Sequence, residues 1–383
     1  MEKKRIKERL GKQHIETPSW GYADSGTRFK VFPQAGAARS LEERLEDAAQ
    51  VHRYTGICPS VALHIPWDRT DDWNGAKKYA ADLGLSIGAI NPNLFQEPQY
   101  MLGSICHPSA EVRRQAEQHI LECIEIARIT GSADISLWLG DGTNYPGQDS
   151  FRERKQRMER SLTRVCDALP EHMRLLIEYK FFEPAFYHTD IGDWGIAYLL
   201  ARKLGEQAQV LVDLGHHPLG TNVEQIVAIL IDEGKLGGFH FNNKKFADDD
   251  LTVGSINPYE LFLIYNELAA AEVDADTEEE AARIAYMIDQ SHNVKNKIEA
   301  MIQSVMMLQE CYAKALLVDR EALQAARRAG GIIDAEECLK DAFATDVRPL
   351  LRELRADMGL DADPLAAFRA GGYQKRIEAK RVR

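Results

Sequence analysis

The middle of the chain alternates short apolar runs with longer amphipathic stretches. Most of the apolar runs are rich in Val, Ile and Leu, which is the composition of strands that are buried on both faces. We therefore predict seven buried strands, at residues 60–65, 85–90, 135–139, 175–179, 210–214, 238–241 and 285–288.

Helical patterns lie between these runs, for example at 109–129, 151–169 and 222–234. Strand alternating with helix indicates a parallel sheet with crossover helices, and we predict a (β/α)₈ TIM barrel of the α/β class. Seven strands are one short of a closed barrel, and we expect the eighth as a short piece near 248–253. An open doubly wound sheet is the alternative, but no Gly-rich phosphate loop follows the first strand.

Residues outside this alternation form two extensions in the prediction. Residues 1–50 are expected to be an N-terminal extension of a basic helix and an aromatic loop, and 51–295 to be the TIM-barrel catalytic domain. Residues 296–383 are expected to be a helical C-terminal extension, because apolar residues recur along one helix face from residue 298 to residue 308. Such a helical tail often clasps a neighbouring subunit.

Composition narrows the function classes further. The net charge of −12 argues against a nucleic-acid partner, because neutralising phosphates requires a basic face. No stretch approaches the roughly 18 apolar residues of a membrane span, and the N-terminus lacks the apolar core of a signal peptide. The six cysteines are scattered, with no CxxC pair. These features predict a cytoplasmic protein with no membrane partner.

Polar side chains follow most of the predicted strands. In a barrel, the carboxyl ends of the strands point into one shared bowl, where active sites are built. Each of these residues alone has an ordinary reading as a loop cap or a hydrogen-bonded core group. In chain order the candidates are His64, Trp67, Asp68, Asn91, Asn93, Trp138, Asp141, Glu178, Lys180, Asp213, His216, His217, His240, Asn242, Asn243, Asp289, Ser291 and His292.

Four successive strands deliver a carboxylate or an imidazole to this bowl, namely Glu178, Asp213, His240 and Asp289. Burying them together costs several kcal/mol unless a cation compensates the charge. We therefore predict a metal site. Carboxylates and imidazole without a thiolate suit Mn²⁺, Co²⁺ or Mg²⁺ better than a structural zinc.

A second group of potential ligands lies close by in the sequence. It consists of His216, Asp248 and Asp250, and Glu178 could bridge two ions if the two groups converge. The alternative for the two aspartates is an acidic loop in solvent.

Six segments give the chain a family resemblance. They are VALHIPWD (61–68), LGDGTNYPGQ (139–148), IEYKFFEPAFY (177–187), LVDLGHH (211–217), GGFHFN (237–242) and MIDQSHN (287–293). In this order they resemble bacterial L-rhamnose isomerases, within the group that accepts several aldoses among the xylose-isomerase-like TIM barrels. The resemblance covers nearly the whole chain.

The resemblance implies a monosaccharide substrate and two divalent ions per subunit, Mn²⁺ before Co²⁺ or Mg²⁺. It implies that L-rhamnose is converted to L-rhamnulose, with activity on aldoses such as D-allose, in a homotetramer. A neighbour's N-terminal aromatic, Phe29 or Phe32, would close the pocket. The resemblance assigns the first ion to Glu178, Asp213, His240 and Asp289, and the second to His216, Asp248 and Asp250 with Glu178. It assigns catalytic roles to Lys180, His64, Asp289 and Ser291, and sugar binding to His64, Trp67, Trp138 and Lys180.

One segment departs from the family pattern. After His240-Phe-Asn, the chain has Asn243, Lys244 and Lys245 where relatives carry an acidic and a small residue before the lysine. We expect Lys244 to point away from the ions, because a second cation beside them is unfavourable. The departure bears on substrate preference and not on the metal ligands.

Two routes of hydrogen transfer occur in this superfamily, a metal-assisted 1,2-hydride shift and a proton transfer through an enediol. We favour the hydride shift, because the second metal would carry a basic hydroxide and no unpaired glutamate is evident. A ketose 3-epimerase is the alternative enzyme, although Asp289 replaces one glutamate of its acid–base pair. A metal nuclease conflicts with the charge of −12, and a sugar-binding protein without activity would leave Lys180 without a role.

Overall fold

The computed structural model describes residues 3–27, 30–143, 145–183 and 187–381. Eight parallel strands close into a barrel in the order β1-β13-β12-β11-β8-β6-β5-β4. This confirms the predicted TIM barrel and excludes the open doubly wound sheet. The barrel strands are β1 (Ile15–Pro18), β4 (Ser60–Ile65), β5 (Ser86–Pro92), β6 (Asp134–Trp138), β8 (Arg174–Glu178), β11 (Ala208–Asp213), β12 (Leu236–Phe241) and β13 (Ala285–Ile288).

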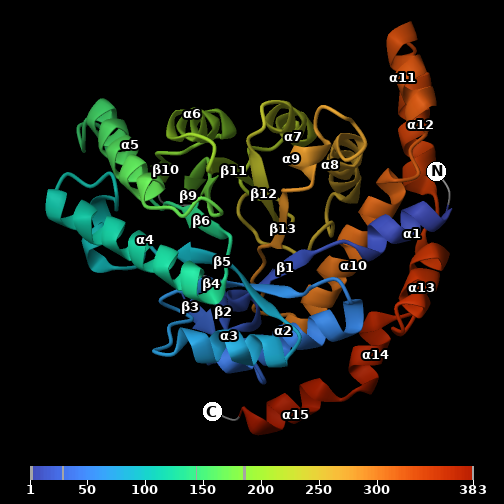
Figure 1. The fold of residues 1–383 in the computed structure, drawn as a ribbon, viewed down its shortest axis with the longest axis horizontal. Helices are drawn as coiled ribbons and strands as arrows, with labels where there is room; N and C mark the ends of the chain where they lie inside the picture. The colour runs from blue at the N-terminus through green and yellow to red at the C-terminus, as the bar shows by residue number, and fades with distance from the viewer. Residues whose placement is uncertain (1–2, 28–29, 144, 184–186, 382–383) are drawn as a thin grey trace.

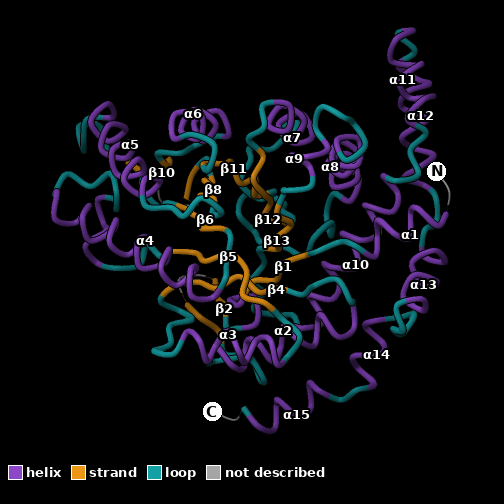
Figure 2. Tube along the Cα trace, in the orientation of Figure 1, coloured by secondary structure: helices purple, strands orange, loops and turns teal. Residues whose placement is uncertain are grey.

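Helices surround this barrel, as Figures 1 and 2 show. A helix follows each barrel strand: α2 (Leu41–Thr55), α3 (Trp73–Asp82), α4 (Ala110–Thr130), α5 (Phe151–Asp167), α6 (Trp194–Leu204), α7 (Val223–Asp232), α8 (Pro258–Ala271) and α10 (Lys297–Ala315). Most begin at a side-chain cap; Ser109, for example, accepts a hydrogen bond from Glu111 N at the start of α4.

Shorter elements lie at the ends of the barrel. A three-stranded sheet in the order β7-β10-β9 stands beside the carboxyl end, and β2 pairs with β3 in a hairpin. The bounds of the short elements are η1 (Ser19–Tyr22), β2 (Ser25–Thr27), β3 (Lys30–Phe32), η2 (Pro98–Leu102), β7 (Gly142–Thr143), β9 (Phe182–Glu183), β10 (Tyr187–Thr189) and α9 (Glu278–Ala281).

The eighth strand is β1 and not the expected piece near 248–253, which contributes only an isolated bridge between Asn243 and Leu251. Strand β1 closes the barrel between β13 and β4. Its sequence, Ile-Glu-Thr-Pro, has one apolar residue before the proline, so it lacks the apolar run of a buried strand. Strand β1 and most of α2 precede residue 51, and α10 follows residue 295, so elements of the barrel lie on both sides of the expected domain boundaries.

The C-terminal helices run along one side of the barrel (Figure 1). The predicted apolar face of α10 is buried, which confirms the helical pattern from residue 298 to residue 308. At the end of the chain, Arg381 donates to both carboxylate oxygens of Asp47 in α2 at 2.8 and 3.0 Å. The remaining helices are α1 (Lys3–Gly11), α11 (Arg320–Ala329), α12 (Ile332–Ala344), α13 (Arg348–Asp357), α14 (Pro364–Ala370) and α15 (Tyr373–Lys380).

Two negative findings accompany the fold. None of the helices in the described parts of the chain is long and apolar enough to cross a membrane. All six cysteines are free thiols, four of them buried.

Candidate metal centre and substrate pocket

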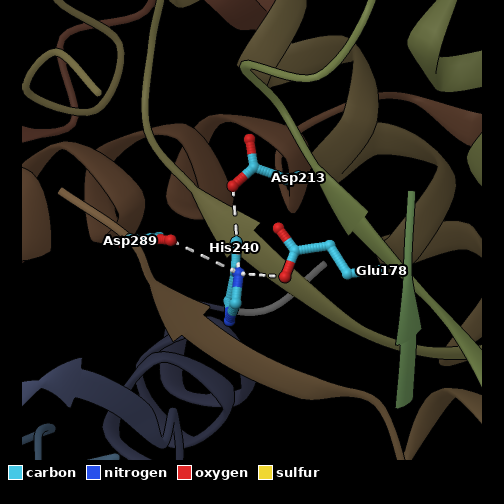
Figure 3. Close-up of side chains that lie close together, drawn as sticks. All are labelled: Glu178, Asp213, His240 and Asp289. Atoms are coloured by element: carbon cyan, nitrogen blue, oxygen red, sulfur yellow. Dashed lines mark ion pairs between the residues drawn. The ribbon is translucent and has the colours of Figure 1, made fainter. Parts of the chain in front are cut away.

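Four ligand-type side chains converge at the carboxyl end of the barrel (Figure 3). Glu178 and Asp213 are the last residues of β8 and β11, His240 is the fifth residue of β12, and Asp289 directly follows β13. Parallel register brings Asp213 level with His240, whereas Glu178 pairs with Leu211 and His240 pairs with Met287, two residues before Asp289. One donor atom from each of the four lies within 4.8 Å of all the others.

His240 is the centre of this group. Its Nδ1 lies 3.3 Å from Glu178 Oε2, 3.6 Å from Asp289 Oδ2 and 3.8 Å from Asp213 Oδ2. Among the described residues, this buried nitrogen has no hydrogen-bond partner. Burial opposes a charge on the ring, but Glu178 and the two aspartates outweigh it and raise the pKa of His240 to about 9.

The carboxylates crowd one another. Burial raises the pKa of Asp213 to about 7; His216 opposes that rise, and the negative charge of Glu178 adds to it. Burial also raises the pKa of Asp289. The carboxylates of Glu178 and Asp213 are buried and that of Asp289 is partly exposed, and an imidazole nitrogen turned toward them is left unbonded. These groups fit an oxygen-and-nitrogen site for a divalent cation. The donor set therefore suits the divalent-metal site that the residues at the strand ends predict.

A second group of donors adjoins the first. Asp213, His216 and Asp248 also offer ligand atoms within 4.8 Å of one another. His216 Nε2 lies 3.0 Å from Asp248 Oδ1. The two oxygens of Glu178 face one imidazole from each group, since Oε1 lies 3.2 Å from His216 Nδ1 and Oε2 faces His240. Glu178 is thus placed between the two groups, as a bridging ligand requires.

Asp250 lies in the same pocket but outside both groups of close donor atoms in the described chain. Its backbone is left-handed, with φ of 46°, a conformation that Asp tolerates better than most residues. Its Oδ1 accepts a long hydrogen bond of 3.4 Å from Asn242 Nδ2, which also donates to Asp213. Of the seven expected ligands, Asp250 is the one that lies outside the two groups of close donor atoms in the described chain.

Lys180 is a cationic residue of the pocket wall. Its ammonium group donates to Asp248 Oδ2 at 2.6 Å and to Glu183 Oε2 at 2.7 Å, and lies 5.0 Å from the centre of the Trp138 ring. Burial disfavours its charge, but Asp248 and Glu183 outweigh burial and raise the pKa of Lys180. Lys180 therefore stays protonated beside the candidate metal ligands.

These groups line a cavity of about 600 Å³ that also contains His64, Trp67 and Trp138, which were expected to bind the sugar, and Ser291, which was expected to be catalytic. His64 stacks on Trp67 with ring centres 3.9 Å apart. Burial lowers the pKa of His64 to about 3, so the ring is neutral. Its Nδ1 is buried and makes no hydrogen bond within the described chain, so it can bind a hydroxyl of a ligand.

Sequence reasoning missed several residues of this pocket. Trp20, Phe95, Gln96 and Glu183 line it. Trp20 follows β1, which was not predicted, and the other three lie several residues beyond the ends of β5 and β8. The one available signal for Trp20 was the aromatic loop after Pro18, which was assigned to the N-terminal extension without a role in the pocket. Of the expected closing aromatics, Phe29 lies outside the described residues and Phe32 is the last residue of β3.

Lys244 does not line the pocket among the described residues. Its ammonium group instead donates to the main-chain carbonyl of His217, which follows the expectation that it points away from the ions.

The barrel and its ring of carboxylates and imidazoles define a (β/α)₈ protein with a divalent-metal type of donor set. The sequence profile of the xylose isomerase-like TIM barrel family matches residues 47–264, more than half of the chain. The chain belongs to the xylose isomerase-like TIM barrel family.

Curated relatives and solved structures agree with this family. A protein of Rhizobium meliloti (strain 1021) named "Probable sugar isomerase" is 45% identical over 381 residues, covering 98% of this chain and 88% of the relative. The structure of an L-ribulose 3-epimerase is similar with a TM-score of 0.56 at 15% identity, covering 84% of this chain and 98% of its own. A 3-keto-D-glucoside 4-epimerase from E. coli gives 0.55 at 14%, covering 78% and 100%. At these identities, the two structures support the fold alone.

Proposed function

We propose that the protein is a divalent-metal aldose–ketose isomerase that converts L-rhamnose to L-rhamnulose and accepts related aldoses such as D-allose. The observation that carries the proposal is the convergence of Glu178, Asp213, His240 and Asp289 in the wall of a cavity large enough for a monosaccharide. The relative named as a sugar isomerase supports the reaction class. The six ordered motifs support the choice of L-rhamnose.

In this proposal Glu178, Asp213, His240 and Asp289 hold one ion. His216, Asp248 and Asp250 hold a second ion together with Glu178, and Mn²⁺ is the preferred metal. When bound, the ions act as Lewis acids that stabilise negative charge on neighbouring sugar oxygens. The positions of Glu178 and His216 favour two ions, whereas Asp250 lies outside the close donor atoms of the second group in the described chain.

The remaining pocket residues bind and orient the sugar. Lys180 presents a protonated ammonium group that polarises the oxygen on C1. His64 is neutral, and its unbonded Nδ1 can hydrogen-bond near the ring oxygen, where the sugar opens. Trp67 and Trp138 supply flat apolar walls for the C–H faces of the sugar, and Ser291 supplies a hydroxyl beside Asp289.

Hydrogen passes between C1 and C2 as a hydride shift in this proposal. Every carboxylate among the described lining residues already has a partner. Glu183 binds Lys180, and Asp24 accepts from the backbone N–H of Gln34. The others belong to the two donor groups or accept from Asn242. A free carboxylate that could act as the base of an enediol route is therefore missing from the described lining. Reaction in D₂O tests this, and substantial solvent deuterium on C1 or C2 of the product would contradict the hydride shift.

A ketose 3-epimerase is the second candidate, since the first donor group alone would satisfy its need for one ion. Such an enzyme uses a pair of glutamates as acid and base, and here the last barrel strand is followed by Asp289. Asp289 thus favours the isomerase.

One substrate panel separates the two candidates. The purified protein with Mn²⁺ is incubated with L-rhamnose, D-allose, L-mannose and L-lyxose, and in parallel with D-tagatose and L-ribulose, and products are identified by ¹³C NMR. We expect each converted aldose to yield its 2-ketose, with L-rhamnose fastest. Ketose epimerisation without any aldose conversion would overturn the isomerase assignment.

A further inference from the structure

Trp20 makes the contact that links the N-terminal segment to the candidate metal centre. It lies in η1, the single turn that follows β1, and its indole Nε1 donates to Asp289 Oδ1 at 2.8 Å. The other oxygen of this carboxylate, Oδ2, is the one that faces His240 at 3.6 Å. The indole N–H thus binds one oxygen and leaves the second turned toward the other three ligands.

Asp289 depends on such a restraint because it stands just beyond the end of β13. Its own N–H still bonds to Phe241 O at 3.1 Å, which fixes the backbone, but the side chain accepts its hydrogen bond from Trp20. Metal ligands with a hydrogen-bonded outer oxygen are oriented for binding, and loss of such a partner typically costs 10–100-fold in metal affinity.

The turn that carries Trp20 is itself fixed on both sides. A Cβ on Gly21 would lie 2.9 Å from Met301 Cε and 3.0 Å from the carbonyl oxygen of Gln290, so the turn packs directly against the residue after Asp289. On the other side, Ser19 donates to the buried carboxylate of Asp68.

The same turn reaches the sugar side of the pocket. Asp68 also accepts from the backbone N–H of His64 at 2.7 Å. The Trp20 ring meets the His64 ring edge to face, with centres 5.5 Å apart. One short turn therefore touches both the metal ligands and the sugar-binding wall.

We propose that Trp20 is a positioning residue of the metal centre: its indole N–H orients Asp289 and thereby sets the affinity for the first divalent ion. This inference rests on the proposed metal site at Asp289. It assigns a function to a segment that the sequence pattern placed outside the catalytic domain.

The test is the Trp20→Phe variant, which keeps an aromatic ring in the turn and removes the N–H. Mn²⁺ affinity is measured by isothermal titration calorimetry on protein stripped with a chelator, and circular dichroism and thermal melting of the stripped protein monitor the fold. We expect the dissociation constant to rise about 10–100-fold. A role limited to packing would lower the melting temperature of the stripped protein and leave the affinity unchanged.

Trp67→Phe is the matched control. Trp67 lines the same pocket and stacks on the same histidine, but its Nε1 donates to Gln96 Oε1 at 2.8 Å and not to a candidate ligand. We expect this variant to bind Mn²⁺ with the parent affinity. Equal affinities in the parent and Trp20→Phe would overturn the inference, as would an equal loss in both variants.

A measurement on the parent protein avoids dependence on the folding of a variant. The chain has five tryptophans, so ¹⁵N-indole labelling gives a simple spectrum. The Trp20 N–H signal should shift on addition of diamagnetic Mg²⁺ more than the Trp67 signal does. An unshifted Trp20 signal in protein that calorimetry shows to bind Mg²⁺ would overturn the inference alone, whereas a parent that binds neither Mn²⁺ nor Mg²⁺ overturns the proposed function with it.

Discussion

Replacing Asp213 with Asn should stabilise the metal-free protein at alkaline pH while abolishing tight metal binding. Asp213 is fully buried, and burial, with added repulsion from Glu178, raises its pKa from 3.8 to about 7 although His216 acts against the rise. Ionising this carboxyl in the metal-free protein therefore costs free energy of folding. Asn has almost the same shape and no charge.

The size of the effect follows from the pKa and the hydrogen bonds. Moving the pKa from 3.8 to about 7 corresponds to about 4 kcal/mol of unfolding free energy. Asp213 accepts from Gly215 N at 2.7 Å and from Asn242 Nδ2 at 2.9 and 3.1 Å. The amide oxygen of Asn can keep the bonds to Oδ1, and the lost bond costs about 1–2 kcal/mol. A net stabilisation of about 2–3 kcal/mol remains at pH 8.

The pH dependence has a definite sign. A carboxyl whose folded pKa is raised destabilises the folded state progressively as pH rises from 3.8 through about 7. The advantage of Asp213→Asn should therefore be absent near pH 4 and full near pH 8. Thermal melts of chelator-treated parent and variant at the two pH values measure it, and Mn²⁺ titration checks the loss of binding. A variant that is less stable than the parent at pH 8, or a difference independent of pH, would refute this account of the charge cluster.

Other substitutions test the pocket and the C-terminal anchor. Lys180→Met should lower kcat for L-rhamnose about 100–1000-fold at saturating Mn²⁺, because the buried ammonium group is lost from the pocket wall; a kcat within threefold of the parent would remove Lys180 from the mechanism. Arg381→Met should lower the unfolding free energy by about 3–5 kcal/mol, because it leaves the buried carboxylate of Asp47 without its cationic partner and with only the hydrogen bond from the Tyr373 hydroxyl. Its control is Arg369→Met, which breaks an exposed pair with Glu299 and should cost less than about 1 kcal/mol in thermal melts; equal losses would contradict the role of burial.

The seven strands that could be predicted from the sequence are those that apolar runs mark. Ser60–Ile65 and Ala285–Ile288 are found within the predicted bounds, and the other five predicted strands differ by one or two residues at their ends. The residues at their carboxyl ends could be predicted to form a site, because the carboxyl ends of parallel strands meet at one face of the barrel. Register then placed Asp213 beside His240 with no further information.

Strand β1 could not be predicted from the sequence, because the partners of its buried Glu16 lie far away in the chain. Glu16 is buried with its carboxylate against Gly88, where a Cβ would collide with Oε2, and it accepts from Ser60 Oγ and Ala89 N. A small residue in β5 makes room for a large one in β1. No local pattern in the sequence contains that relation.

The contact between Trp20 and Asp289 could not be predicted from the sequence for the same reason. Its hydrogen bond to Asp289 joins residues 269 positions apart, and it depends on β1 delivering the turn to the rim of the barrel. Because β1 was not predicted, Trp20 after it could not be placed at the site.

Removal and return of the metal decides whether the protein is a metal-dependent aldose isomerase. The parent and Asp289→Ala are stripped with a chelator, and conversion of L-rhamnose to a 2-ketose is followed by NMR before and after addition of Mn²⁺. We expect that the stripped proteins convert no L-rhamnose and that the parent regains activity with Mn²⁺. Asp289→Ala should stay folded and should not regain activity. Conversion that persists without metal, full recovery by Asp289→Ala, or a Mn²⁺-loaded parent that converts no aldose would contradict the proposed function.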